Sequence, residues 1–383
     1  MRYFISTGEP SGELHASELM RAIIERDPEA EFVYLGGEKM EEVSGTKPLI
    51  DIREMSVMGF SQVIKKLPII FSHLRKVKRM LKEKRPDAVI LVDYPSFNLK
   101  IARMASKLGL PVFWYISPKV WVWKEHRVKM MKKTITRLYS ILPFEPEYFA
   151  SRHDWDVEYV GNPSVEEINR RIKEFQKVSK KEFKLCHGLP SDKPILALVP
   201  GSRVQEIKSN LPIMVDVARR FADYEPVVTA MKDLPVELYE QLAPGVPRLT
   251  GETLETLSHS DVALVTSGTA TLETALVGIP QVMMYRHSGS RLMYKLGRRF
   301  LKVKYFSLPN LIDNEEVIPE LVMHFCTPDA VHTKLSMLLN DESIREQQLK
   351  GYKSIKERLG ERVASDTVAD DIVEFIKKNY KKD

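Results

Sequence analysis

Short apolar runs alternate with longer amphipathic segments along the whole chain, and this alternation constrains the fold more than any other feature. Runs such as Ala88–Val92 and Ile195–Val199 have the length and composition of buried strands. Segments with helical periodicity, such as Ile69–Lys84 and Asn210–Ala222, follow in each half of the chain. This order is typical of a mostly parallel sheet with helices between its strands, so we predict an α/β fold.

The predicted strands form two groups. The first group is Arg2–Thr7, Glu31–Leu35, Ala88–Val92, Val112–Tyr115, Arg137–Ile141 and Glu158–Val160, and the second is Ile195–Val199, Glu225–Thr229, Val262–Thr266 and Gln281–Tyr285. Between them a polar segment from Pro163 to about Gly188 predicts a connecting helix and a domain boundary. We therefore predict two Rossmann-like domains, over 1–165 and 166–340, facing each other across a cleft. A helical tail over 341–383 follows, and packing of this tail on the first domain is one option.

Composition restricts the class of protein. A content of 43% hydrophobic and 29% charged residues is typical of a globular chain. The apolar runs are far shorter than the ~20 residues that cross a bilayer, and the first residues show no signal-peptide pattern. Cys186 and Cys326 stand far apart, which argues against a disulfide or zinc framework and fits a reducing cytoplasm. We expect a cytoplasmic protein.

Positive charge is concentrated in three segments, although the net charge is only +6. Residues 61–85, 119–137 and 286–304 each carry a run of Lys and Arg with at most one acid. Such clusters attract nucleic acid, phosphorylated ligands or an anionic membrane, while solvated helix faces are the alternative. Because no nucleic-acid module is recognisable and the neighbouring residues are aliphatic, we do not expect nucleic acid. The apolar residues of 55–81, among them Ile69, Ile70 and Phe71, favour a membrane surface and an acylated substrate.

Two turns in the second half have the composition of a phosphate site. The turn after strand 195–199 contains Gly201, Ser202, Arg203 and Glu206, and the turn after strand 262–266 contains Ser267, Gly268, Thr269, Ala270, Thr271 and Glu273. Glycine allows close backbone approach, arginine offers a forked donor, and a helix N-terminus attracts anions. Either turn alone could simply be capped, but both at one sheet edge favour phosphate binding. Neither turn matches a dinucleotide or P-loop pattern.

Three turns in the first half are also distinctive. Gly8 to Glu13 follow the first strand and place Glu9, Ser11 and Glu13 at its carboxyl end. Asp93 ends strand 88–92, the position expected of a general base, although capping of the next helix is the alternative. The segment 117–123 carries Trp121 and Trp123 directly after a strand, which a packed corner or a wall against sugar or lipid would explain.

These turns, taken together, resemble the lipid-A-disaccharide synthase family, inverting glycosyltransferases with the GT-B fold. The resemblance covers nearly the whole chain. It rests on GEPSGE at 8–13, Val57-Met58-Gly59, DYPSFN at 93–98, SPKVWVW at 117–123, LPFE at 142–145, PGSR at 200–203, SGTATLE at 267–273, SLPNL at 307–311 and Pro319-Glu320-Leu321. Three positions depart from the family pattern, namely Glu13 for Asp, Ser96 for a second acid, and Asn162 for His.

The resemblance implies a reaction and a set of site residues. A 2,3-diacylglucosamine unit would pass from UDP to the 6-hydroxyl of 2,3-diacylglucosamine 1-phosphate, giving a β-1,6-linked disaccharide and UDP. The 200–206 and 267–273 turns with Asn310 would hold UDP, and Asp93 would be the base, with Glu9 and Glu13 as rivals. The acceptor and lipid side would comprise Ser11, Gly12, Met58, Asn98, Ser117, Trp121, Ile69, Ile70 and Phe71. No cofactor is expected, and a homodimer is left open.

Two further interpretations remain at this point. A nucleotide-sugar epimerase can have the same architecture, but it needs no lipid-facing surface like that expected over 55–81. A metal-dependent transferase is suggested by the Asp154-Trp155-Asp156 triplet. Because this triplet lies far from the phosphate turns in the sequence, we interpret it as incidental and expect no metal.

Overall fold

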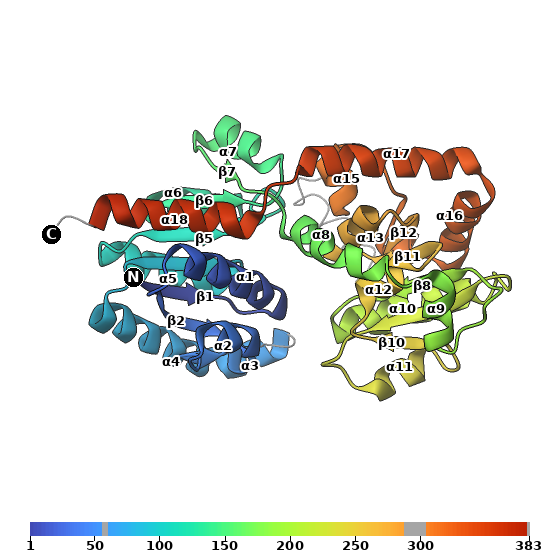
Figure 1. Ribbon diagram of the computed structural model, residues 1–383, viewed down its shortest axis with the longest axis horizontal. Coiled ribbons are helices and arrows are strands. Elements are labelled where there is room, and N and C mark those ends of the chain that lie inside the picture. Colours follow the sequence, from blue (N-terminus) through green and yellow to red (C-terminus); the bar gives the residue numbers. More distant parts are fainter. Residues whose placement is uncertain (56–59, 287–303, 381–383) are drawn as a thin grey trace. The chain divides into compact units, whose positions relative to one another are not determined.

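The computed structural model describes residues 1–55, 60–286 and 304–380. The chain divides into unit 1, Met1–Pro163 with Glu361–Asp383, and unit 2, Ser164–Gly360. Each unit contains one parallel sheet with helices interleaved between its strands, as predicted (Figure 1). The unit boundary after Pro163 lies two residues before the one expected. The segment 341–383, expected as one tail, is divided between the units after Gly360.

The sheet of unit 1 has the strand order β3-β2-β1-β4-β5-β6-β7. Its strands are β1 (Arg2–Ser6), β2 (Glu31–Gly36), β3 (Ile50–Asp51), β4 (Ala88–Val92), β5 (Val112–Tyr115), β6 (Arg137–Ser140) and β7 (Glu158–Tyr159). Its helices are α1 (Pro10–Arg26), α2 (Glu38–Ser44), α3 (Ile52–Met55), α4 (Phe60–Lys84), α5 (Pro95–Lys107), η1 (Glu125–Arg127), α6 (Val128–Thr134), α7 (Glu145–His153) and α18 (Ala364–Tyr380). Because the order reverses beside β1, the carboxyl ends of β1 and β4 form a switch point.

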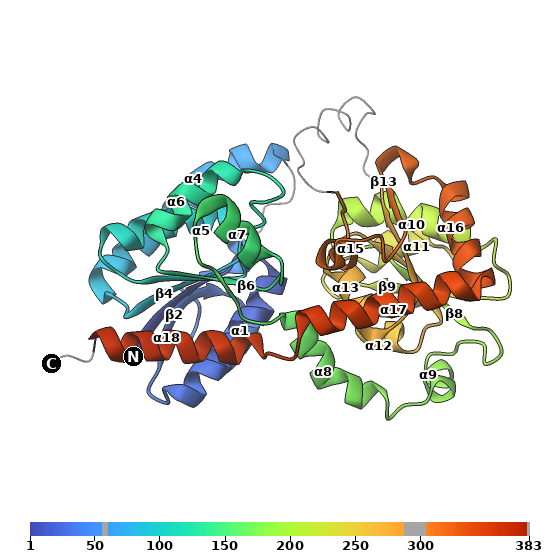
Figure 2. The ribbon, with the colours of Figure 1, turned by 90° about the horizontal axis from the view of Figure 1, so that it is seen from above.

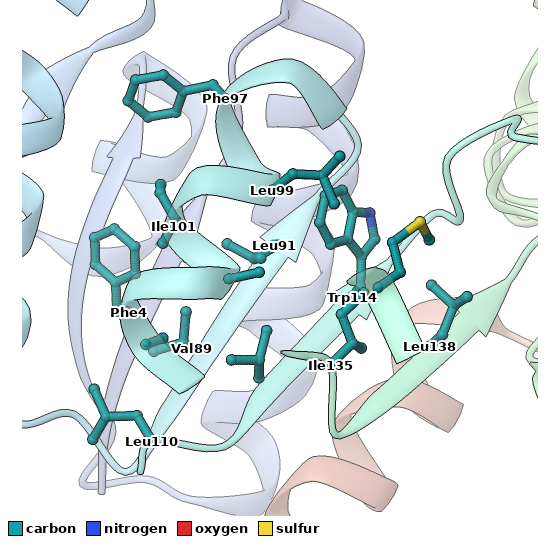
Figure 3. Packing of buried hydrophobic residues seen from close by; sticks show 14 of the residues in the cluster. Phe4, Val89, Leu91, Phe97, Leu99, Ile101, Leu110, Trp114, Ile135 and Leu138 are labelled. Carbon is teal, nitrogen blue, oxygen red and sulfur yellow. The ribbon is translucent and has the colours of Figure 1, made fainter. Parts of the chain in front are cut away.

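Both faces of this sheet are buried, which explains why β4 is apolar at every position. One face places Phe4, Val89, Leu91 and Trp114 against α4, α5 and α6 (Figure 3). The opposite face packs on α1 and α18, and Figure 2 shows these two layers of helices on either side of the sheet. Arg26 of α1 holds α18 in place through ion pairs with Asp366 and Asp370.

Unit 2 has the strand order β10-β9-β8-β11-β12-β13. Its strands are β8 (Ile195–Val199), β9 (Glu225–Ala230), β10 (Arg248–Thr250), β11 (Val262–Thr266), β12 (Gln281–Tyr285) and β13 (Glu320–Val322). Its helices are α8 (Pro163–Phe175), α9 (Lys180–Cys186), α10 (Val204–Ala218), α11 (Val236–Leu242), α12 (Thr253–Ser258), α13 (Thr269–Val277), α15 (Leu308–Asp313), η2 (Met323–Phe325), α16 (Pro328–Asn340) and α17 (Glu342–Leu359). One face of the sheet packs on α10, α11 and α16. The segment 163–188, predicted as one connecting helix, forms the two helices α8 and α9.

Within its described residues, the structure adds three strands to the ten predicted. β3, β10 and β13 are edge strands of two or three residues, and this length is too short to show a periodicity of two. Several helices also begin earlier than their apolar periodicity suggests. α1 and α5 start at Pro10 and Pro95, where proline supplies the backbone angle of a first helical residue and lacks only an N–H that would be unpaired there.

Candidate active site

The two phosphate-type turns of unit 2 leave neighbouring strands. β8 pairs with β11 in parallel, with Val199 opposite Val265, so both turns begin at the same edge of the sheet. Gly201 has a φ of 102°, and a Cβ added there would lie 2.6 Å from Oε2 of Glu206 and 3.4 Å from the Thr266 side chain. The first turn therefore contacts the end of β11, and the positive φ of Gly201 favours glycine at this position.

Arg203 and Glu206 form a pair at the start of α10. Nη1 of Arg203 lies 3.6 Å from Oε1 of Glu206, and the Arg203 backbone N–H donates to Oε2 of Glu206 over 3.4 Å. The Arg203 side chain is 70% exposed, whereas the Glu206 side chain is 16% exposed. Glu206 is therefore largely enclosed and supports the turn, whereas the guanidinium of Arg203 is exposed to solvent at the carboxyl end of the strands.

The second turn opens α13. Thr271 is buried, and its hydroxyl donates to the Gly268 carbonyl over 2.8 Å, which closes the first helical turn. Gly268 and Thr269 are exposed. The exposed N-terminus of α13 thus offers backbone N–H groups at the same edge as Arg203, an arrangement suited to an anion.

Glu273, one turn into α13, has a carboxyl group whose pKa is raised to about 7. Burial is the main cause, and the nearby Glu167 adds to it while Arg171 opposes it. Both of these residues belong to α8. A shifted pKa of this kind is common at ligand sites, and the predicted hydrogen bonding of Glu273 to the ribose stays a prediction.

Asn310 is fully buried, and its amide serves the protein itself. Its Nδ2 donates to the Ile318 carbonyl and to Oε1 of Glu320, and its Oδ1 accepts from the N–H groups of Val317 and Ile318. The carboxylate of Glu320 also accepts from the backbone N–H of Ser307 over 2.8 Å. The structure thus places Asn310 inside a polar cluster that shapes the segment 306–320.

One hydrogen bond links this polar cluster to the turn over 267–273. The Ser267 hydroxyl donates to the Phe306 carbonyl over 3.3 Å, and the backbone N–H of Phe306 donates to Glu320 over 2.9 Å. Glu320 was singled out by sequence only as part of a motif, without a role. Its position indicates that it supports the segment beside Ser267.

The distinctive turns of unit 1 also share one sheet edge. They follow β1, β4 and β5, which are consecutive in the sheet. The turns after β1 and β4 are in contact, since a Cβ added to Gly8 would lie 2.4 Å from the Tyr94 ring. Asp93 is half-buried at the end of β4 and has a φ of 45°. The strand order therefore brings these turns to the same end of the sheet, and the turns after β1 and β4 pack directly against each other.

Glu9 and Glu13, the alternative candidates for the general base, occupy different environments. Glu9 is exposed, and its negative charge adds to burial in raising the pKa of Tyr94. Glu13 is buried, and its Oε1 accepts from the backbone N–H of Lys39 over 2.8 Å at the start of α2. Glu13 thus acts as a cap for α2, whereas Glu9 extends to solvent. Of the neighbouring residues, Ser11 is exposed and Gly12 is buried.

The segment after β5 is held in place by hydrogen bonds of buried residues. Ser117 is buried, with its N–H donating to the Tyr139 carbonyl over 3.1 Å. Trp121 is buried and donates from Nε1 to Oε1 of Glu145 over 2.8 Å. Trp123 is 58% exposed, with Nζ of Lys124 at 3.7 Å from its ring centroid. From the sequence, Glu145 was recognised only as part of the LPFE motif, and its hydrogen bond with Trp121 was not predicted.

The family model described as lipid-A-disaccharide synthetase matches residues 3–372. The chain belongs to this family. A lipid-A-disaccharide synthase of Myxococcus xanthus is 35% identical over 98% of this chain and 97% of the relative, and one of Koribacter versatilis is 34% identical over 94% and 93%. These matches confirm the predicted family, and the predicted activity and enzyme class are those after which the relatives are named.

Solved structures show how widely the fold of this synthetase family is shared. UDP-GlcNAc 2-epimerase from Neisseria meningitidis, bound to UDP-GlcNAc, matches with a TM-score of 0.64 at 12% identity, over 99% of this chain and all of that chain. The glycotransferase of kitacinnamycin matches with a TM-score of 0.60 at 12% identity, over 98% of both chains. At such identities the likeness shows the fold alone, so the epimerase alternative is a structural neighbour and nothing more.

The apolar surface expected for this synthetase lies partly on α4. Ile69 and Phe71 are 44% and 53% exposed, and Nζ of Lys100 lies 5.7 Å from the Phe71 ring centroid. Ile70 differs, because it packs against the core of unit 1. Met58 lies outside the described residues. Within the described part of the chain, no helix is both long and apolar enough to cross a membrane.

The Asp154-Trp155-Asp156 triplet lies at the end of α7. Asp154 ends α7 with a φ of 46°, and its carboxylate lies 3.5 Å from Nζ of Lys132. Trp155 packs edge-on against Phe149 of α7. Over residues 1–55, 60–286 and 304–380, no group of three His, Cys, Asp or Glu side chains is arranged to hold a metal ion.

Proposed function

We propose that the chain forms the β-1,6-linked lipid A disaccharide 1-phosphate, with Asp93 as general base. The donor is a UDP-linked diacylglucosamine, and the acceptor is a diacylglucosamine 1-phosphate. The observation that carries this assignment is the position of Asp93, a half-buried acid at the carboxyl end of a central strand, beside the switch point of unit 1. Ligands of open α/β sheets bind at such a position.

The transfer proceeds by displacement at the anomeric carbon of the donor. The acceptor oxygen forms the new bond as the bond to the UDP oxygen breaks, and the acceptor proton passes to the Asp93 carboxylate. Because attack comes from the face opposite the leaving group, an α-linked donor gives a β-linked product. UDP leaves with an additional negative charge on its terminal phosphate.

Unit 2 supplies the groups that offset this charge. The Arg203 guanidinium is exposed at the sheet edge, and the N-terminus of α13 offers N–H groups with the positive end of the helix dipole. Glu273 is proposed to hydrogen-bond the ribose of UDP. Glu206 holds the turn that carries Arg203, and Asn310 holds the segment 306–320 beside Ser267.

A membrane surface is the proposed source of the acylated substrates. Ile69 and Phe71 are exposed on α4, and Lys100 of α5 lies over the Phe71 ring, so apolar and cationic groups occur together. Acyl chains and anionic headgroups suit such a surface. We therefore propose a cytoplasmic enzyme attached to the inner face of the cytoplasmic membrane.

A product assay tests the reaction directly. The purified chain is incubated with UDP-diacylglucosamine and diacylglucosamine 1-phosphate, and the products are examined by mass spectrometry. The expected result is a tetraacylated disaccharide 1-phosphate with an equal amount of UDP. An epimerised donor, formed without any acceptor, would instead support the epimerase and overturn the proposal.

A further inference from the structure

The turn that carries Asp93 has an uncommon backbone. Asp93 and Tyr94 have φ angles of 45° and 47°, in the left-handed region that residues with a side chain rarely adopt. Among the described residues, no other two adjacent non-glycine residues both have a positive φ. Such a conformation persists only where surrounding contacts hold it. The question is which contacts hold this turn.

The side chain of Asn98 supplies the polar contacts. Asn98 is completely buried at the start of α5, and its Nδ2 lies 2.8 Å from the carbonyl oxygen of Asp93, 3.2 Å from that of Ser6 and 3.3 Å from that of Val92. Its Oδ1 accepts from the Ser6 hydroxyl over 2.7 Å. One amide thus joins the last residues of β1 and β4 to Asp93 itself.

The backbone and the Tyr94 ring hold the turn from two other directions. The N–H groups of Phe97 and Asn98 both donate to the Tyr94 carbonyl, over 3.3 and 3.1 Å. The Tyr94 ring covers Gly8, where a Cβ would lie 2.4 Å from the ring. The turn is therefore fixed to the first turn of α5 and to the turn after β1, and Asn98 is the side chain common to β1, β4 and Asp93.

We infer that Asn98 is a positioning residue, which sets the direction of the Asp93 side chain by holding the Asp93 carbonyl. This inference rests on the proposed role of Asp93 as base. The chemistry requires an amide at this position. A carboxylate would face three carbonyl oxygens and repel them, and an aliphatic side chain would remove the donor that these oxygens share and the acceptor of the Ser6 hydroxyl. The role differs from the direct acceptor contact predicted from sequence, because no surface of Asn98 is exposed.

The test compares Asn98→Ala with a variant that weakens the same helix elsewhere. Ile101, also on α5, is completely buried in the core, so Ile101→Ala lowers the melting temperature without touching the turn. For Asn98→Ala we expect kcat to fall about 10- to 100-fold, since small displacements of a catalytic group have effects of this size. The KM for the donor and the Kd for UDP should stay unchanged. Ile101→Ala should keep kcat within about twofold when assayed below its melting temperature.

A double variant separates positioning from a general loss of structure. In an Asp93→Asn background, Asn98→Ala should lower kcat little further, because the group that it positions is already inactive. A full additional loss there, or an Asn98→Ala kcat no lower than that of Ile101→Ala, would overturn the inference while Asp93 remains the base. Near-parental turnover of Asp93→Asn alone would overturn the proposed base as well. If Asn98→Ala does not fold, Asn98→Ser takes its place with the same expectations.

Discussion

Trp121 donates a hydrogen bond from its indole Nε1 to Oε1 of Glu145 over 2.8 Å, inside unit 1. Glu145 is buried, and burial raises its pKa to about 7 although Ser140, Trp121 and Lys119 favour the charged form. The Ser140 hydroxyl lies close to both Oε2 of Glu145 and the Leu142 carbonyl. A neutral Glu145 can donate to Ser140, so that the Ser140 proton remains available for Leu142.

The first prediction is that Glu145 makes stability depend on pH. Its pKa in the folded state, about 7, lies above the ordinary glutamate value of ~4.3, so the folded state binds the proton more tightly. The contribution of Glu145 to stability is therefore fully present below pH ~4.3 and is lost as the pH rises through about 7, a change of roughly 3.5 kcal/mol at most. Glu145→Gln imitates the neutral form, so it should match the parent at pH 4 and exceed it in stability at pH 8. Urea unfolding at both pH values measures this.

Trp121→Phe serves as the control for this prediction. It removes the indole N–H but keeps the carboxyl group buried, so the pH dependence of stability should remain. Equal pH dependence in the parent and in Glu145→Gln would show that Glu145 is ionised in the folded state throughout.

The second prediction concerns the UDP diphosphate. Arg203→Ala should weaken UDP binding by roughly 1.5–3 kcal/mol, the range for a hydrogen bond to a charged group. Arg203→Lys should restore only part of this, because lysine lacks the planar fork. Calorimetric titration with UDP measures both. Arg220 is a suitable control, since it is also exposed and pairs with Asp216 and Asp329. An unchanged affinity in Arg203→Ala would place the diphosphate elsewhere.

The third prediction separates support from direct contact at Asn310. Asn310→Ala removes the amide that bonds to both the N–H and the carbonyl of Ile318, and each buried group left without a partner costs about 1–3 kcal/mol. Unfolding without any ligand should therefore occur at clearly lower denaturant concentration than in the parent. Ser202→Ala, in the exposed part of the first turn, should leave this midpoint unchanged. An Asn310→Ala variant of parental stability that has lost UDP affinity would instead indicate a direct ligand contact.

Most of the fold could be predicted because buried parallel strands have a strong sequence signal. Five of the ten predicted strands have the bounds that the structure gives them, among them Ala88–Val92 and Val262–Thr266. The short edge strands β3, β10 and β13 were missed because two or three residues carry no periodicity. α17 was grouped with α18 because both are amphipathic, and periodicity alone does not show which core an apolar face contacts.

The candidate site was only partly predictable, for a different physical reason. The composition of the turns located the carboxyl ends of the strands, because strand ends and small residues can be recognised in the sequence. It could not distinguish side chains that extend to solvent from those that hold the backbone. Arg203 and Glu206 are three residues apart, yet one is exposed and the other supports the turn. Asn98, Glu13 and Asn310 likewise proved to bond mainly to backbone groups from other segments.

The fourth prediction concerns membrane binding through α4. Replacing Ile69 and Phe71 together with Ser should reduce partitioning onto anionic vesicles about tenfold or more, since each half-exposed side chain contributes ~1 kcal/mol on burial. High salt should weaken attachment of the parent by screening its cations. Ile70→Ser is the control, because Ile70 packs on the core and its loss should affect stability more than vesicle binding. Parental vesicle binding by the double variant would exclude these side chains as the attachment site.

The last prediction identifies the base. Asp93→Asn keeps the size and the hydrogen-bonding ability of the side chain but removes the basic oxygen, so kcat should fall by ~10²–10⁴-fold while UDP affinity stays nearly constant. Glu13→Gln should act mainly on stability, because Glu13 caps α2 through Lys39. Glu9→Gln is the more informative comparison, since Glu9 is exposed in the turn packed against Tyr94. Steady-state rates with saturating donor and acceptor decide between them. If Glu9→Gln loses turnover while Asp93→Asn keeps it, the base belongs to the turn after β1, and Asp93 then serves only to shape the turn after β4.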